Sequence, residues 1–138
     1  MEIRTYRAED EAAVLHLWRA CNLVVAQNDP LKDIQRKTAV QPDLFLVGLE
    51  SGRIVATVMA GYEGHRGWLN YLAVVPDLRK KGLGRQMVEE AERKLRQLGC
   101  PKINLLVRTS NIDVLEFYQR LGFSKDDVVG MGKRLIKD

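Results

Sequence analysis

The most informative segment of the chain is Val74-Val75-Pro76-Asp77-Leu78-Arg79-Lys80-Lys81-Gly82-Leu83-Gly84-Arg85. The residues around it predict a strand over Trp68–Val75, followed by a long helix over Gly82–Leu98. An apolar stripe runs along this helix and consists of Leu83, Met87, Val88, Ala91, Leu95 and Leu98. Gly99 follows directly, and glycine commonly stands just past the end of a helix. The segment therefore joins the end of a strand to the start of a helix.

This junction has the composition of an anion-binding site. The first N–H groups of a helix have no partner within the helix, and the helix dipole adds partial positive charge there. A pyrophosphate can accept several of these N–H groups at once. Gly82 and Gly84 remove β-carbons that would hold a phosphate away. Cationic side chains surround the loop: Arg79, Lys80, Lys81 and Arg85. The alternative is a basic turn that faces only water.

Other sites with basic or glycine-rich loops fit this segment less well. A P-loop requires Ser or Thr after its lysine, and neither is present. A dinucleotide-binding loop requires a third glycine near Met87. The net charge of +4 is modest, and the chain contains no helix-turn-helix pattern and no pair of RNA-stacking aromatic residues. A nucleic acid partner is therefore disfavoured.

The rest of the chain predicts a mixed α/β protein. Further strands are expected over Met1–Tyr6, Asp43–Leu49, Arg53–Tyr62 and Lys102–Val107, and a last hairpin from Phe123 to about Ile136. Further helices are expected over Asp10–Cys21, Leu31–Ala39 and Ile112–Leu121. Asp29-Pro30 predicts the start of the second helix, and Asn111 or Ser110 the cap of the last one. Because strands and helices do not alternate strictly, a mixed sheet is favoured over a doubly wound parallel one.

Length and composition limit the class of protein. The 138 residues suit one domain, spanning residues 1–138. No stretch approaches the roughly 20 apolar residues of a membrane helix, and the N-terminus does not resemble a signal peptide, so we expect no membrane and a cytoplasmic location. Cys21 and Cys100 form no metal-binding pattern, so we expect no metal and two buried thiols, with a disulfide as the alternative.

Two motifs carry a resemblance to a known family. The first, Arg79-Lys80-Lys81-Gly82-Leu83-Gly84, resembles the [RQ]xxGx[GA] motif of the GNAT acetyltransferases. The second consists of Asn111, Val114, Tyr118 and Gly122-Phe123, with valine in place of the family's usual alanine. Three further stretches resemble a small bacterial subgroup, the YpeA-like acetyltransferases: Asn28-Asp29-Pro30, Gly64-His65-Arg66-Gly67 and Gly132-Lys133-Arg134-Leu135-Ile136. The resemblance covers essentially the whole chain. It implies the α/β GNAT fold, a mixed central sheet with splayed central strands flanked by helices on both faces.

The resemblance also implies an activity and a cofactor. GNAT enzymes transfer an acetyl group from acetyl-CoA to a primary amine by direct attack on the thioester, so an N-acetyltransferase that acts on a small-molecule or peptide amine is expected. The residues that match the cofactor site are Leu72, Ala73, Val74, Arg79, Lys80, Lys81, Gly82, Leu83, Gly84, Arg85, Asn111 and Tyr118. A homodimer is also compatible with the family. The alternative function is a sensor that binds acetyl-CoA with little turnover.

The catalytic groups follow less directly. By resemblance Tyr118 is the general acid, the alternative being simple packing, and the N–H of Ala73 or Val74 stabilises the carbonyl oxygen. Two positions that carry a basic glutamate in some relatives hold Trp68 and Leu106 here. Candidate bases are therefore Glu63, His65, and Tyr71 through a water, unless the first two are merely solvated loop residues.

The absence of a placed carboxylate bears on the acceptor. An α-amine has a pKa near 8 and a lysine amine one near 10.4, so an α-amine or weakly basic amine needs less help to lose its proton. We expect the acceptor to lie along residues 23–33 and 63–68. Arg66 is a candidate to attract a substrate carboxylate, and Asp29 either holds the amine or only caps the second helix.

Overall fold

The computed structural model describes all 138 residues and divides the chain into two compact units. The first comprises residues 1–104 together with Asp138, and the second comprises residues 105–137. The first unit contains the sheet and three of the four α-helices, and the second contains the last helix and the segment that follows it. That the whole chain forms one domain stays a prediction.

The first unit is built on a five-stranded sheet with the order β1-β2-β3-β4-β5. The strands are β1 (Glu2–Thr5), β2 (Phe45–Glu50), β3 (Arg53–Tyr62), β4 (Gly67–Val74) and β5 (Ile103–Asn104). Neighbours from β1 to β4 are antiparallel, whereas β5 runs parallel to β4. The mixed sheet that the sequence predicts is confirmed.

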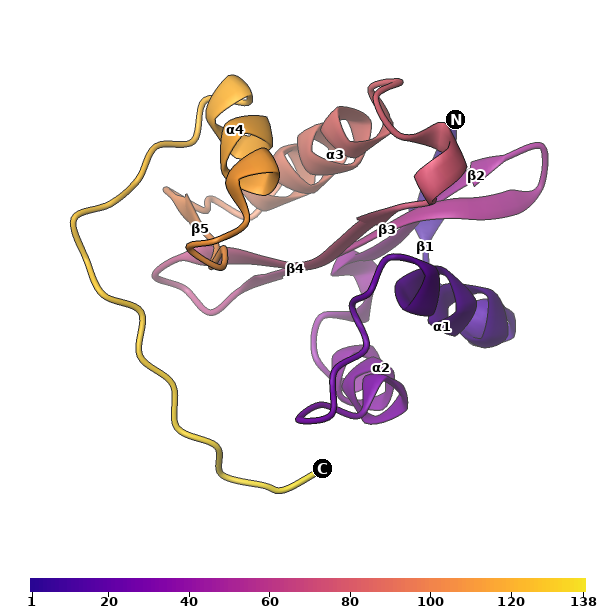
Figure 1. Ribbon diagram of the computed structural model, residues 1–138, viewed down its shortest axis with the longest axis horizontal. Coiled ribbons are helices and arrows are strands. Elements are labelled where there is room, and N and C mark those ends of the chain that lie inside the picture. The colour runs from indigo at the N-terminus through magenta and orange to yellow at the C-terminus, as the bar shows by residue number, and fades with distance from the viewer. The chain divides into compact units, whose positions relative to one another are not determined.

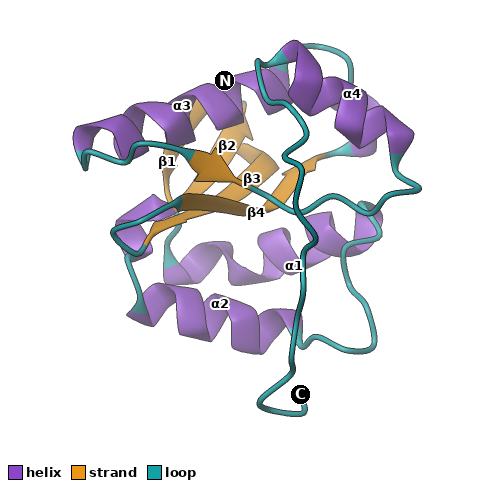
Figure 2. Cartoon of the chain, turned by 90° about the vertical axis from the view of Figure 1, so that its left-hand side faces the viewer, coloured by secondary structure: helices purple, strands orange, loops and turns teal.

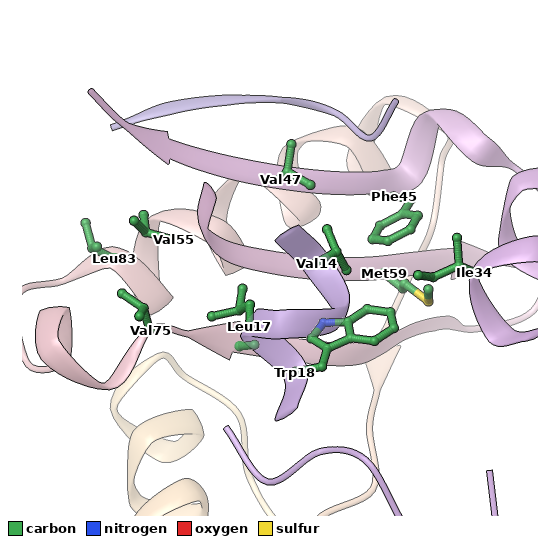
Figure 3. Close-up of a cluster of buried hydrophobic side chains, with 11 residues drawn as sticks. Val14, Leu17, Trp18, Ile34, Phe45, Val47, Val55, Met59, Val75 and Leu83 are labelled. Carbon is green, nitrogen blue, oxygen red and sulfur yellow. The ribbon is translucent and has the colours of Figure 1, made fainter. Parts of the chain in front are cut away.

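Helices cover both faces of this sheet. Helices α1 (Glu11–Ala20) and α2 (Pro30–Ala39) lie on one face, and α3 (Leu83–Gln97) lies on the other (Figures 1 and 2). Short 3-10 helices, labelled η1 to η3, span Ala8–Asp10, Pro42–Leu44 and Pro76–Leu78. The second unit contains α4 (Ile112–Arg120). Figure 3 shows the apolar cluster of the first unit, in which Trp18 and Leu17 of α1 pack against Phe45, Val47 and Val55 of the sheet.

Two expectations about strands need correction. The strand expected over Lys102–Val107 pairs with β4 only through Ile103 and Asn104. The expected hairpin from Phe123 to Ile136 is wrong, because no strand follows α4. Its apolar side chains are exposed, including Val128, Val129, Met131 and Leu135. A two-stranded hairpin is marginal in water unless one face is buried, so apolar alternation alone does not form it.

Two other features concern the whole chain. Cys21 and Cys100 are free thiols, so the disulfide alternative is wrong, and both are partly rather than fully buried. None of the helices has the length and apolar character that crossing a membrane requires.

A buried ion pair joins the first strand to the start of α1. The Asp10 carboxylate is 5% exposed and accepts two hydrogen bonds from the Arg4 guanidinium, at 2.7 and 3.0 Å. It also accepts the backbone N–H of Arg7 at 2.8 Å. Arg4 and this N–H hold the pKa of Asp10 below its ordinary value. The pair therefore fixes where the chain turns from β1 into α1.

Asp10→Asn should lower the free energy of unfolding by about 2 kcal/mol, because it removes the charge that Arg4 pairs with in a partly desolvated position. The measurement is urea denaturation at pH 7. Because the folded pKa of Asp10 is lowered, its stabilisation is complete above the unfolded pKa of about 3.9 and is lost as the pH falls. The difference between variant and parent should therefore shrink in acid. An equal difference at pH 7 and in strong acid would contradict this account.

Candidate functional site

The loop between β4 and α3 has an unusual backbone conformation. After η3, Arg79 is extended, and both Lys80 and Gly82 have positive φ, of 64° and 81°. Gly82 is the N-cap residue of α3, and no side chain caps the helix. A β-carbon added at Gly82 would meet nothing within 4 Å. The first N–H groups of α3 thus lack side-chain partners at an open turn.

The charge around this turn is positive. Arg79, Lys80, Lys81 and Arg85 are all exposed, and the first turn of α3 contains no acidic residue. Arg85 forms only an exposed i,i+4 pair with Glu89, at 3.5 Å. Such pairs contribute little and exchange readily for a stronger partner. The predicted phosphate loop therefore has both the donors and the charge that a pyrophosphate requires.

Strand β4 contains a bulge just before this loop. Thr57 pairs with Ala73 and Met59 pairs with Asn70, so Tyr71 and Leu72 together face the single residue Val58. Tyr71 has a φ of 52°, which is unusual for a residue other than glycine. A bulge leaves one residue without a ladder partner and turns the strand. The backbone that approaches Ala73 and Val74, the expected oxyanion donors, is therefore redirected at Tyr71.

A buried polar chain holds the bulge in place. Thr57 is 0% exposed, and its hydroxyl donates to the Tyr71 carbonyl at 2.8 Å. The same hydroxyl accepts Trp18 Nε1–H at 2.9 Å. The Trp18 and Tyr71 rings also stack, with centroids 3.9 Å apart. The unusual backbone at Tyr71 is thus fixed by a side chain of β3 and a side chain of α1.

The far edge of β4 has no strand partner beyond its first two residues. The β4–β5 ladder ends at the pair Trp68 and Asn104, so Ala73 and Val74 pair only with β3, and Leu72 lies in the bulge. An open edge of this kind can pair with an extended ligand as with another strand. The Val74 carbonyl is already engaged, since Cys21 Sγ donates to it at 3.3 Å and Arg79 Nε at 3.2 Å. Leu72, which has no register partner on β3, is therefore the freer position of this edge.

A second group of polar side chains extends from the bulge to α2. The Tyr71 hydroxyl donates to Asp33 Oδ2 at 2.6 Å, and Asp33 Oδ1 lies 3.3 Å from Arg36 Nη1. Burial and the Asp33 hydrogen bond raise the pKa of Tyr71 above its ordinary value, so the phenol keeps its proton. Asp29 caps α2 by accepting the N–H groups of Leu31 and Lys32. The capping role for Asp29 is confirmed.

The loop between β3 and β4 contains two of the expected catalytic residues. The Glu63 carboxylate accepts the backbone N–H groups of His65 and Arg66, and these bonds lower its pKa. His65 is exposed, and its Nδ1 lies 3.4 Å from Arg66 Nη1. Arg66 donates to the His65 carbonyl at 2.9 Å. Glu63 and Arg66 are thus bound within their own loop, and His65 is the candidate with a free ring edge.

The remaining predicted residues lie on α4 in the second unit. Asn111 caps this helix through its Oδ1, which accepts the Val114 N–H at 3.4 Å. Its amide N–H₂ group remains able to donate. Tyr118 is 8% exposed and makes edge contacts with Phe117 and Phe123. Burial raises the pKa of Tyr118 to about 12, so its hydroxyl stays protonated at neutral pH.

The sequence analysis missed three residues that organise this region. Thr57 is a lone polar residue in the apolar run of β3, and that isolation was its only signal. Arg36 stands three residues after Asp33, a spacing at which helical side chains meet. Asp138, which contacts Arg36, has no local signal because 102 residues separate the two.

Comparison with known proteins gives a consistent result. The sequence profile of the acetyltransferase (GNAT) family matches residues 11–123. An acetyltransferase of Pectobacterium atrosepticum is 47% identical over 138 residues, which is 100% of this chain and 98% of that protein.

Solved structures show the same fold. The ribosomal-protein-S18-alanine N-acetyltransferase of Escherichia coli has a TM-score of 0.75 and 24% identity, covering 91% of this chain and 78% of that one. The aminoglycoside N-acetyltransferase AAC(6')-Iy, solved in complex with CoA, has a TM-score of 0.74 and 18% identity, covering 96% and 99%. At these identities the likeness concerns the fold.

The polar chain behind the bulge gives a test of its structural role. Thr57→Val keeps the shape of the side chain but leaves Trp18 Nε1–H and the Tyr71 carbonyl without their partner. The free energy of unfolding should therefore fall by about 3 kcal/mol. Chemical denaturation measures the loss. The matched control is Thr38→Val, because Thr38 is exposed and bonds only to Gln35 of its own helix. Equal losses in the two variants would show that Thr57 has no special role.

Proposed function

Because the chain belongs to the acetyltransferase (GNAT) family, we propose that it is an N-acetyltransferase that moves an acetyl group from acetyl-CoA to a primary amine. The observation that carries the proposal is the uncapped start of α3, approached through positive φ values at Lys80 and Gly82. The N-acetyltransferase neighbours and the neighbour that holds CoA support the same class of reaction. A cytoplasmic location and a possible pairing of two copies belong to this proposal as well.

The residues of the loop fit the donor. The pyrophosphate would accept the N–H groups from Gly82 to Arg85, with Arg79, Lys80 and Lys81 supplying counter-charge. The extended pantetheine arm would pair with the open edge of β4 around Leu72, and by resemblance to the family the Asn111 amide would donate to it. Acetyl-CoA supplies the thioester carbon that the amine attacks.

The reaction forms one bond and breaks another. The nitrogen of the neutral amine bonds to the acetyl carbon, the carbon–sulfur bond breaks with its electron pair leaving on the CoA thiolate, and one proton passes from the nitrogen to the base. An N–H of Ala73 or Val74, aimed by the bulge, would stabilise the oxygen as it becomes anionic. A positioned donor of this kind is typically worth about 10²–10³ in rate.

Tyr118 is proposed to serve the departing sulfur. Its pKa of about 12 keeps the phenol protonated throughout the neutral range. A thiol has a pKa near 8.5, so full proton transfer from this phenol to a thiolate is unfavourable. Tyr118 therefore acts mainly as a hydrogen-bond donor to the leaving sulfur.

His65 is the best of the candidate bases. Tyr71 holds its proton, and the lowered pKa of Glu63 makes that carboxylate a weak base. His65 has an exposed imidazole on the loop that we expect to line the acceptor. A base without a buried carboxylate behind it suits an α-amine or another weakly basic amine better than a lysine side chain.

The experiment that tests the function follows free thiol release from acetyl-CoA with amines of graded pKa. We expect turnover to favour α-amines and weakly basic amines, and mass spectrometry to find the added acetyl group on nitrogen. A clear preference for lysine side chains would overturn the acceptor class. Tight binding of acetyl-CoA without turnover on any amine would support the alternative, a sensor of the same fold.

Gly84→Asp should weaken acetyl-CoA binding by more than about 100-fold, because it adds a side chain and a negative charge where phosphate would sit. Isothermal titration calorimetry measures the change. The control is Gly132→Asp in the segment after α4, which adds the same charge at an open position without a positive φ. Unchanged affinity in Gly84→Asp would overturn the phosphate-loop assignment.

Tyr118→Phe should lower kcat by about 10²-fold while the Kd for acetyl-CoA changes little, because the lost hydrogen bond acts mainly as the sulfur departs. The raised pKa of Tyr118 adds a second expectation: the parent enzyme should lose no activity between pH 8 and 10 through Tyr118, since its phenol ionises only near 12. Equal losses in kcat and affinity would make Tyr118 a packing residue.

A further inference from the structure

A guanidinium and a backbone N–H of the α2 region bind one carboxylate. Asp138 Oδ1 lies 2.7 Å from Arg36 Nη2, and Asp138 Oδ2 lies 3.2 Å from Arg36 Nη1. The backbone N–H of Asp29, at the N-cap of α2, donates to Oδ2 at 3.1 Å. The Asp138 side chain is 2% exposed, and these donors hold its pKa well below the usual range. Arg36 and the Asp29 N–H thus form a complete binding site for one carboxylate, here called the carboxylate site.

This carboxylate lies close to the expected chemistry. Arg36 Nη1 also contacts Asp33 Oδ1, and Asp33 Oδ2 accepts the hydroxyl of Tyr71. Tyr71 is the residue at the β4 bulge. The carboxylate site is therefore separated from the bulge only by the side chains of Asp33 and Tyr71. An acceptor whose carboxylate occupied this site would have its other polar groups beside Asp33.

The carboxylate site has the properties of a site whose occupant can be exchanged for another carboxylate. The Arg36 side chain is 48% exposed, and an ion pair with so exposed a member contributes little to folding stability. A planar guanidinium binds any carboxylate in the same bidentate geometry. The N-cap amide adds the positive end of the helix dipole. Another carboxylate could replace that of Asp138 without leaving a charge unpaired.

We propose that Arg36 and the Asp29 N–H form a carboxylate subsite for the acceptor, and that Asp138 occupies it until an acceptor displaces it. The proposal rests on the proposed function and narrows its substrate to primary amines that carry a carboxylate. It replaces Arg66 in that role, since the Arg66 guanidinium donates to its own loop. The carboxylate could belong to a free amino acid or to a peptide.

The test compares pairs of acceptors in which one member carries a carboxylate and the other carries an amide in its place. One pair is an amino acid and its amide, and a second is the peptides Ala-Asp-amide and Ala-Asn-amide, which separate a free amino acid from a peptide side chain. We expect the parent enzyme to prefer the carboxylate member of at least one pair in kcat/KM. Arg36→Gln should lower that preference by about tenfold or more, since a bidentate charged contact is lost.

Two further variants sharpen the result. Arg36→Lys keeps the charge but loses the bidentate geometry, so it should lower the preference for the carboxylate acceptor by a smaller factor. Asp138→Asn should lower the KM of the carboxylate acceptor severalfold, because the occupant becomes uncharged. The control is Arg93→Gln, which removes an exposed i,i+3 ion pair with Glu90 on α3 and should change neither activity nor preference. Circular dichroism verifies that each variant is folded.

The outcomes separate this proposal from the function itself. Acetylation of amines with a preference that Arg36→Gln leaves unchanged would overturn the subsite and keep the N-acetyltransferase. An unchanged or higher KM in Asp138→Asn would overturn the claim that Asp138 occupies the subsite. If no amine is acetylated, the function fails, and acetate titrated into Asp138→Asn decides the subsite by NMR. A saturable shift of the Arg36 Nε–H signal would support the subsite, and no shift would overturn it.

Discussion

The bulge in β4 sets the geometry of the candidate site. A residue other than glycine adopts positive φ at a cost of about 1–2 kcal/mol, so Tyr71 keeps this conformation only because neighbouring groups hold it. Thr57 and Trp18 do so, and Trp18 also belongs to the apolar cluster in which α1 packs against β3. The packing of the core and the direction of the β4 edge are thus coupled.

The bulge also connects two parts of the proposed site. Beyond it, β4 continues to Val74 and the loop that leads into α3. On its other side, the Tyr71 side chain extends through Asp33 to α2. In the proposed site, the backbone of β4 would therefore serve the donor, while a side chain of the same strand would position the acceptor. A change that relaxed the bulge would disturb both together.

The sequence predicted those features that depend on neighbouring residues. Asp29-Pro30 begins α2, Gly99 follows the end of α3, and Asn111 caps α4, because each signal acts within one turn of helix. It did not predict positive φ at Tyr71, which depends on a hydroxyl 14 residues away, or the contact of Arg36 with Asp138. The false hairpin after Phe123 has the same cause, since apolar alternation does not reveal whether a partner surface exists.

This difference follows from how each part of the site binds. Phosphates and an extended pantetheine arm are bound mainly by backbone N–H groups, and the glycines that expose such groups are visible in the sequence. In the proposed site, the acceptor would instead contact side chains of α2 and β4 and would displace Asp138. A short motif is therefore enough to predict the donor. The acceptor would depend on charges such as Arg36, whose partner becomes apparent only in the folded chain.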